Sequence, residues 1–203
     1  MTFSKTELEK KIEPAKSLLD QYIQLLLKWQ KSINLIAPST IQNIWERHIL
    51  DSALLYFLLD SNVHTLMDVG SGAGLPGMII AILNHTFNGP LNDILLVESD
   101  LKKSLFLEEC QRSLNVPVRV VRERVENLRE NPDIITARAF APLKDLLELV
   151  QNNVSRETIL LLPKGKNVEA EIKNNIYPCE IQRINNTVNT EGYILKIKGV
   201  TYA

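Results

Sequence analysis

Apolar residues recur at spacings of three and four along the amino-terminal part of the chain, a periodicity typical of amphipathic helices. The first such stripe runs from Leu8 to Trp29 and the second from Ile41 to Leu59. Between them, Pro38-Ser39-Thr40 supplies a break and a helix-capping residue. We therefore expect residues 1–62 to form a helical cap on the rest of the protein rather than an independent domain.

From residue 65 onward, short apolar runs alternate with stretches of helical periodicity. Strands separated by helices of about ten to fifteen residues favour right-handed βαβ units and a mostly parallel sheet that is covered on both faces. The expected strands are Thr65–Val69, Ile94–Glu98, Val118–Val121, Ile134–Ala137 and Thr158–Leu162, and the expected helices begin near Leu75, Leu101, Val125, Leu143 and Val168.

The pattern changes after Pro178. Two further apolar segments, Cys179–Val188 and Gly192–Val200, are joined by the polar residues Asn189-Thr190-Glu191, which predicts an antiparallel hairpin. At 203 residues with 45% apolar content, the chain can bury one substantial core. We thus expect a single α/β domain over residues 1–203, with a Rossmann-like core at 63–203 whose sheet of seven strands is mostly parallel and ends in the antiparallel hairpin.

A glycine-rich turn follows the first expected strand and is the main candidate for a ligand site. Glycine permits positive φ and close approach of the backbone to a ligand. Gly72, Gly74 and Gly77 also spell the G-x-G-x-x-G pattern of dinucleotide sites, and a tight turn that binds nothing is a third interpretation. The carboxylate of Asp68 would repel a pyrophosphate but suits the ammonium and sulfonium groups of S-adenosylmethionine (SAM), which favours SAM. The expected contacts are Asp68, Gly70, Gly72, Gly74 and Leu75.

Two other strand ends carry charged residues at the edge where open parallel sheets bind ligands. Glu98 ends the second strand, where its carboxylate either accepts hydrogen bonds from both ribose hydroxyls of adenosine or is simply solvated. Arg138 leaves the fourth strand among small apolar residues, and a guanidinium there needs an anionic partner. That partner is the carboxylate of SAM, a protein acid or a substrate phosphate, unless the side chain extends to the surface.

Weaker signals come from two further segments. Val125 and Glu126 open the helix expected after the third strand; there the backbone can meet an adenine edge while Val125 packs on the ring, although a valine before an acid is also an ordinary helix start. Lys164 and Lys166 follow the fifth strand. Both can contact RNA phosphate, although exposed lysines are usually only solvated.

Charge is distributed unevenly along the chain. Between Arg47 and Lys102 there are six acidic residues and no lysine or arginine, whereas the whole chain has a net charge of −1. The remainder is therefore net positive. Either an acidic segment that suits a cationic cofactor has basic flanks that can face an anionic polymer, or this is ordinary surface charge.

Cysteine content and the amino-terminal sequence limit the kinds of site and the cellular location that we expect. Cys110 and Cys179 are the two cysteines and lack metal-ligand spacing, so we expect no metal site. The amino terminus has no signal-peptide apolar region and no run approaches a membrane span, so we expect a cytoplasmic protein without a membrane partner. No apolar stripe is left over to demand a dimer, which favours a monomer.

Two alternative methylation chemistries lack their motifs. Enzymes that methylate exocyclic amines typically carry Asn or Asp before Pro-Pro-aromatic after the fourth strand, where this chain has Ala137-Arg138-Ala139-Phe140. Methylation of a pyrimidine carbon 5 needs a cysteine nucleophile, but Cys179 lies after the last expected helix, away from the expected catalytic loop. A ring nitrogen such as guanine N7 presents a lone pair and no proton, so its methylation needs only positioning and desolvation. The sequence is compatible with N7 without identifying it.

Several strings together resemble the bacterial ribosomal RNA small subunit methyltransferase G family, also known as the glucose-inhibited division protein B family. The resemblance covers nearly the full length. Ile36 and Ala137 depart from it, since threonine and serine are usual there. The matching strings are Asn34-Leu35, Arg47-His48-Ile49-Leu50-Asp51-Ser52, Asp68 through Gly77, Arg124-Val125-Glu126 and Arg138-Ala139-Phe140-Ala141.

The resemblance implies an enzyme that uses SAM, releases S-adenosylhomocysteine and methylates N7 of a specific guanine in 16S rRNA, in the 530-loop region near the decoding centre. Its partner would be 16S rRNA in the small ribosomal subunit or in a precursor of it. The alternatives are a SAM methyltransferase for another RNA or a small molecule, and a non-catalytic RNA-binding module.

The resemblance also implies roles for individual residues. It implies no certain catalytic residue, and it makes Arg138 and His48 candidates for positioning. The SAM site would include Gly70, Leu75, Val125, Glu126 and Arg138, and the residues facing cofactor or RNA would be Asn34, Arg47, His48 and Asp51.

Overall fold

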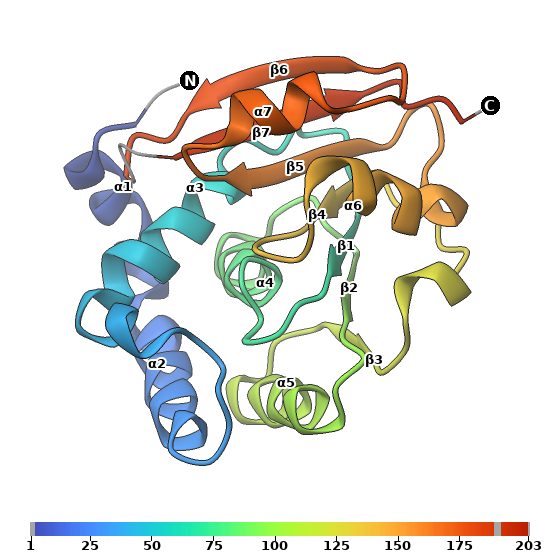
Figure 1. Ribbon diagram of the computed structural model, residues 1–203. Helices are drawn as coiled ribbons and strands as arrows, with labels where there is room; N and C mark the ends of the chain where they lie inside the picture. Colours follow the sequence, from blue (N-terminus) through green and yellow to red (C-terminus); the bar gives the residue numbers. More distant parts are fainter. Residues whose placement is uncertain (1–2, 189–191, 203) are drawn as a thin grey trace.

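One sheet dominates the part of the chain that the computed structural model describes, residues 3–188 and 192–202. Its strands are β1 (Thr65–Val69), β2 (Asp93–Val97), β3 (Arg119–Val121), β4 (Ile134–Thr136), β5 (Ile159–Lys164), β6 (Glu180–Asn185) and β7 (Tyr193–Lys198). The seven strands lie in the order β3-β2-β1-β4-β5-β7-β6, from the bottom to the top of Figure 1. The first five are parallel and β7 is antiparallel to both β5 and β6, which confirms the predicted sheet and hairpin. The expected link at residues 189–191 lies outside the described residues.

The amino-terminal helices form the expected cap, but the first apolar stripe is not one continuous helix. It divides into α1 (Lys5–Ile12), a 3-10 turn η1 (Glu13–Ala15) and α2 (Lys16–Gln30). Pro14 lies in η1. Because proline has no N–H to donate and its ring crowds the preceding turn, α-helical hydrogen bonding is interrupted there. The single helix predicted over Leu8–Trp29 is therefore wrong in this respect.

The second stripe is also less regular than predicted. It consists of a 3-10 helix η2 (Pro38–Asn43), a π-helical turn η3 (Trp45–Leu50) and α3 (Asp51–Tyr56). Turns of the π type are rare and are frequently found at functional sites. Here η3 contains His48 and leads directly into Asp51, two residues that the sequence marks as site candidates.

Both faces of the sheet are covered, because successive residues of the inner strands lie in different apolar clusters. Leu66 of β1 packs in a cluster with the cap, α4 and α5, whereas its neighbour Met67 packs in a cluster with α6 and α7. Figure 1 shows α2, α4 and α5 gathered on one side of β1 and β2. No helix within the described ranges is long and apolar enough to cross a membrane. The helices after the cap are α4 (Gly77–Phe87), α5 (Leu101–Leu114), α6 (Leu143–Val150) and α7 (Val168–Lys173).

The segment after β3 departs most from prediction. The helix expected from Val125 is only a 3-10 turn, η4 (Val125–Asn127), and Leu128 is already extended. Asn131 has a φ of 47° and precedes Pro132, and both features oppose helix at this point. Side-chain amides of the neighbouring 3-10 turn η5 (Gln151–Asn153) donate hydrogen bonds to the carbonyl oxygens of Val125 and Glu126 and so join η4 to η5.

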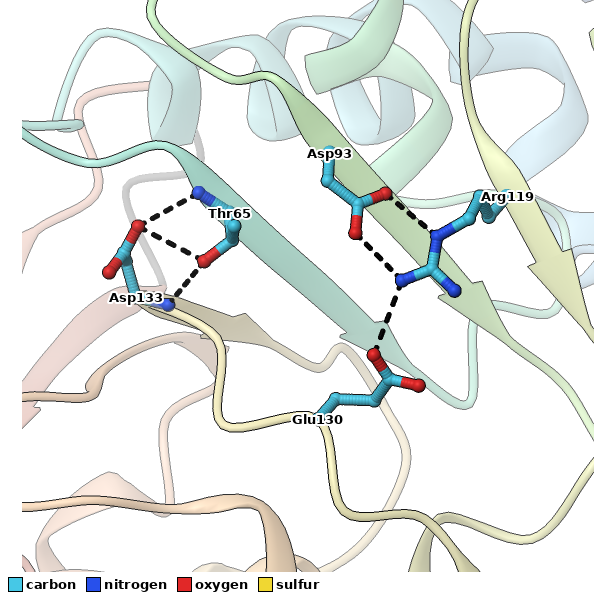
Figure 2. A network of polar contacts seen from close by, with 5 residues as sticks. All are labelled: Thr65, Asp93, Arg119, Glu130 and Asp133. Carbon is cyan, nitrogen blue, oxygen red and sulfur yellow. Dashed lines mark hydrogen bonds and ion pairs between the residues drawn. The ribbon is translucent and has the colours of Figure 1, made fainter.

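Polar contacts join the strands at their amino ends, opposite the edge where the carboxyl ends of the parallel strands meet (Figure 2). Asp133 accepts a hydrogen bond from the Thr65 N–H at 2.9 Å, and its own N–H donates to Thr65 Oγ1 at 2.8 Å. Arg119 donates two hydrogen bonds to Asp93 and one to Glu130. These contacts connect the amino ends of the four strands β1, β2, β3 and β4. They support the register that places the carboxyl ends of these strands side by side.

Candidate functional site

A cavity of about 770 Å³ opens at the carboxyl ends of the parallel strands. Its walls come from the glycine turn after β1, the segment 138–142 after β4, the end of β5 and parts of the helical cap. Of the predicted site residues, the lining includes Arg47, His48, Asp51, Gly70, Gly72, Leu75, Arg138 and Lys164. The other predicted residues lie outside this lining: Asn34, Asp68, Gly74, Glu98, Val125, Glu126 and Lys166.

Asp68 is fully buried beneath the glycine turn instead of facing the cavity. Its Oδ2 accepts hydrogen bonds from Ser71 Oγ at 2.6 Å and the Gly77 N–H at 3.1 Å, and its Oδ1 accepts one from Thr136 Oγ1 at 2.7 Å. Burial raises the pKa of Asp68 to about 6, although the hydrogen bonds from Ser71 and Thr136 oppose that rise. The expectation of direct contact between this carboxylate and the cofactor cations is therefore corrected. Asp68 instead fixes the turn and the start of α4.

The glycine turn is shaped by its backbone and supported from the cap. Gly70 and Gly72 have φ values of 64° and 57°, in the left-handed region that favours glycine. Tyr22 of α2 is fully buried and donates its hydroxyl hydrogen to the carbonyl oxygen of Ala73 at 2.6 Å. The cap thus contacts the turn directly through a hydrogen bond.

Glu98 lies directly behind the same turn. Its Oε2 accepts a hydrogen bond from the Gly72 N–H at 2.9 Å and its Oε1 accepts one from the Asp100 N–H at 2.8 Å. Each carboxylate oxygen has a second lone pair, so Glu98 can hold the turn and still accept hydrogen bonds from hydroxyl groups. Val125 is buried and Glu126 half-buried on the adjacent turn η4.

Arg138 joins the end of β4 to the cap. Its guanidinium donates to the carbonyl oxygen of Arg47 at 3.2 Å and to His48 Nδ1 at 2.9 Å, and it lies 3.6 Å from Asp51 Oδ2. Of the anionic partners that the sequence leaves open, the structure thus provides a protein acid. Burial raises the pKa of Asp51, although hydrogen bonding from Asn186 and the charge of Arg138 oppose the rise.

The hydrogen bonds of His48 define its protonation state. Arg138 is only a donor, so Nδ1 of His48 must be the acceptor and Nε2 must carry the hydrogen. Nε2 lies 2.8 Å from Thr40 Oγ1, and Thr40 in turn donates to the carbonyl oxygen of Ala37 at 2.7 Å. Burial and the positive charge of Arg138 lower the pKa of His48 to about 4. The imidazole is therefore neutral at physiological pH.

This lowered pKa makes folding stability depend on pH. Between about pH 6.5 and 4 the unfolded chain binds a proton at His48 that the folded protein does not, so this contribution to stability is lost as the pH falls. We expect the free energy of unfolding to drop by on the order of 2 kcal/mol more in the wild type than in His48→Asn between pH 7 and pH 4.5. Asparagine keeps an acceptor for Arg138 but does not titrate. Urea titrations of both proteins at the two pH values measure the difference, and parallel pH profiles would contradict the neutral, buried imidazole.

The predicted lysines differ in their environment. Lys164 is largely buried, and its Nζ forms an ion pair with Glu171 at 2.6 Å and donates a hydrogen bond to the carbonyl oxygen of Ala141 at 3.0 Å. Lys166 is exposed near the rim. Asn34 is also exposed, and its Oδ1 accepts a weak hydrogen bond from Gln30 at 3.4 Å.

Sequence reasoning missed several residues of this site. The sequence pattern marked Thr40 only as a helix-capping residue and Tyr22 only as part of the first apolar stripe. Asn186, which follows β6, donates a hydrogen bond to Asp51 and lines the cavity. Because the hairpin brings it to the cap from 135 positions along the chain, no local pattern could have indicated it. Lys103, Phe140 and Glu171 also line the cavity.

Comparisons with known proteins agree on one family. The family model described as rRNA small subunit methyltransferase G matches residues 15–193. A protein named Ribosomal RNA small subunit methyltransferase G from Jannaschia sp. (strain CCS1) is 36% identical over 184 residues, which cover 89% of this chain and 87% of that one. One of the same name from Rickettsia rickettsii (strain Sheila Smith) is 40% identical over 154 residues, covering 76% of this chain and 77% of the relative.

Solved structures share the fold at low sequence identity. The structure of a SAM-dependent methyltransferase from Aquifex aeolicus matches with a TM-score of 0.59 at 13% identity, and the match covers 80% of this chain and 99% of that one. The likeness places the α/β core among the Rossmann-like methyltransferase folds.

Proposed function

Because the chain belongs to the ribosomal RNA small subunit methyltransferase G family, we propose that it methylates N7 of one guanine in 16S rRNA, in the 530-loop region near the decoding centre. The proposed methyl donor is SAM, and S-adenosylhomocysteine is the second product. The proposed partner is the small ribosomal subunit or a precursor of it. Cap and core share one apolar cluster, which supports the further proposal that residues 1–203 act as a single domain.

The observation that supports N7 as the acceptor atom is the lack of an available general base among the described residues that line the cavity. Asp51 is engaged by Arg138, Glu171 by Lys164, and the imidazole of His48 has hydrogen-bonding partners on both nitrogens. An exocyclic amine must lose a proton when it is methylated, whereas N7 presents a free lone pair. A cavity whose acidic side chains are already held in ion pairs therefore suits methylation of N7 better than methylation of an exocyclic amine.

The residues at the glycine turn fit SAM. A β-carbon at Gly72 would have only the carbonyl oxygen of Gly70, at 3.7 Å, and Glu98 Oε2, at 4.0 Å, nearby, so the backbone there is open to a ligand. The second lone pairs of Glu98 suit ribose hydroxyls. Arg138 lies on the same cavity wall, and its five N–H donors exceed its three protein contacts, which leaves donors for a carboxylate.

In the proposed reaction, the protein orients and desolvates the reactants. Bound SAM supplies an electrophilic methyl group on its sulfonium. The chain of hydrogen bonds from Arg138 through His48 to Thr40 holds the wall formed by β4 and the cap in one arrangement. Neutral His48 adds no positive charge beside a cationic donor, and no proton has to leave the base.

Labelled SAM and small subunits that lack the modification test this proposal. The purified protein is incubated with both, and the label is mapped by nuclease digestion and mass spectrometry. We expect one N7-methylguanosine in the 530-loop region of 16S rRNA. Label on another RNA or on a small molecule would favour the alternative acceptors, and SAM binding without any methyl transfer would favour a non-catalytic RNA-binding module.

Replacing Gly72 by arginine tests where the cofactor binds. The side chain would start from a φ of 57° and fill the open side of the turn, so we expect the Kd for SAM to rise at least about 100-fold. Gly199→Arg is a matched control, because Gly199 has a φ of 62°, lies outside the cavity lining and, apart from its chain neighbours, has no atom of a described residue within 4 Å of its β-carbon position. Calorimetric titration that gives wild-type affinity for a folded Gly72→Arg protein would contradict this placement.

A further inference from the structure

Phe140 combines exposure with a place in the cavity. Large apolar side chains that remain exposed among the described residues are Leu101, Leu105, Phe140 and Ile176. Only Phe140 of these four lines the cavity, and 38% of its surface is exposed. Leaving an aromatic ring in contact with water costs hydrophobic free energy, so its position there requires an explanation.

The segment that carries Phe140 is anchored on both sides of the ring. Before it, Arg138 is held by the cap through His48 and Asp51. After it, the carbonyl oxygen of Ala141 accepts a hydrogen bond from Lys164. The backbone between these anchors is therefore restrained on both sides.

The backbone turns sharply just before the ring. Ala139 has a φ of 52°, a left-handed conformation that alanine rarely adopts. This reversal directs Arg138 toward the cap and Phe140 toward the glycine turn. Backbone strain of this kind persists where surrounding contacts enforce it, and it is common at ligand-binding sites.

The ring of Phe140 lies against Gly70. A β-carbon at Gly70 would overlap the ring atoms Cδ2 and Cε2, so glycine is needed for this approach. The side chain belongs to neither apolar cluster of the sheet, and within the described ranges it pairs with no other aromatic ring. The contact with Gly70 thus positions the ring beside the proposed cofactor turn while leaving it open to the cavity.

We propose that Phe140 is the platform on which the target guanine stacks, and that its π electrons stabilise the positive charge which the base acquires during methylation. The inference rests on the proposed function of the same cavity. Aromatic side chains bind unpaired bases by stacking on them. A ring fixed over the glycine turn would hold the stacked base next to the methyl donor.

The charge balance of the reaction gives the ring a second role. The N7 lone pair forms the new N–CH3 bond while the S–CH3 bond breaks and its electron pair goes to sulfur. The sulfonium becomes a neutral thioether, and the purine becomes a cation without any proton moving. An aromatic ring attracts a cation over its face more strongly than a neutral base, so stacking on Phe140 strengthens as the transition state forms.

Variants of Phe140 test the inference in the full-length protein. For Phe140→Leu, we expect kcat/KM with small subunits to fall about 10- to 100-fold while the Kd for SAM stays within about twofold. Phe140→Tyr should retain methyl transfer within about threefold of the wild type. Ile176→Ala, which alters an exposed apolar residue outside the cavity, is the control and should behave as the wild type. Unchanged transfer in Phe140→Leu, or an equal loss of SAM affinity, would overturn the proposal.

A binding measurement separates this inference from the proposed function. We expect the wild type loaded with S-adenosylhomocysteine to bind 7-methylguanosine monophosphate several-fold more tightly than guanosine monophosphate in calorimetric titrations. Phe140→Leu should lose that preference. If the preference depends on Phe140 but no rRNA is methylated, the proposed function fails and the stacking site stands. If rRNA is methylated and neither measurement responds to Phe140, only this inference fails.

Discussion

Replacing Gly77 by alanine should lower the free energy of unfolding by about 3 kcal/mol, at the upper end of what overpacking a core usually costs. The added β-carbon would lie 2.5 Å from Leu96 Cδ2, 2.6 Å from Asp68 Cβ and 2.7 Å from Asp68 Oδ2. These neighbours are fully buried in the sheet, so they have little room to move. Displacing Asp68 would also weaken its hydrogen bond with the Gly77 N–H.

Denaturant unfolding of Gly77→Ala beside Gly165→Ala isolates the steric effect. Apart from its chain neighbours, no atom in the described part of the chain lies within 4 Å of the β-carbon position at Gly165, and its φ is not in the left-handed region. This control should therefore change stability by less than about 0.5 kcal/mol. Two variants of equal stability would show that the start of α4 can shift away from β1 and β2. The tight packing of Gly77 against Asp68 and Leu96 would then be contradicted.

The parallel core was predictable because its signals are local. Apolar runs bounded by turn residues predicted all seven strands to within about two residues of their ends, apart from the carboxyl end of β6, which lies at Asn185 instead of Val188. The expected helix at Val125 failed because Asn131-Pro132 and side chains from η5 decide that segment. The local pattern of residues at Val125–Asn127 does not indicate either of these influences.

The sequence predicted many of the residues of the candidate site, but not the contacts that these residues make. Residues on strand ends, such as Glu98 and Arg138, were found because parallel strands bring their carboxyl ends to one edge. Whether a charged side chain faces the cavity or the protein depends on partners that are distant in sequence. Asp68 turns inward because Thr136, 68 positions away, and Ser71 offer hydrogen bonds beneath the turn. A sequence pattern contains no such information.

The cap shows the same limit. The stripe over Ile41–Leu59 indicated a helix and a buried face, and both are present in outline. The π-helical turn at His48 was not visible in the sequence, because the carbonyl oxygen of Arg47 and the imidazole of His48 make their contacts there with Arg138, 90 or more positions away. Tertiary contacts thus set the local geometry that matters most for the site.

Arg138→Ala should reduce both stability and methyl transfer, because three groups depend on the guanidinium. Asp51 is only 7% exposed and would lose its ion pair with Arg138, while His48 Nδ1 and the Arg47 carbonyl oxygen would lose a donor. Breaking one side of a buried ion pair costs about 3 kcal/mol or more, which for a chain of this length corresponds to a fall in Tm of roughly 6–12 °C. We expect kcat/KM for methyl transfer to fall at least about 100-fold.

A double variant separates the two effects. Asp51→Asn in the Arg138→Ala background removes the buried charge that has lost its ion pair with Arg138, and asparagine can still form a hydrogen bond with Asn186, so most of the lost Tm should return. Methyl transfer should remain low, because no guanidinium is left to hold His48 or to meet an anionic ligand. Arg138→Lys should also transfer poorly, since an ammonium cannot reproduce the planar contacts to three acceptors. Recovery of transfer in the double variant would mean that Arg138 acts only by neutralising Asp51.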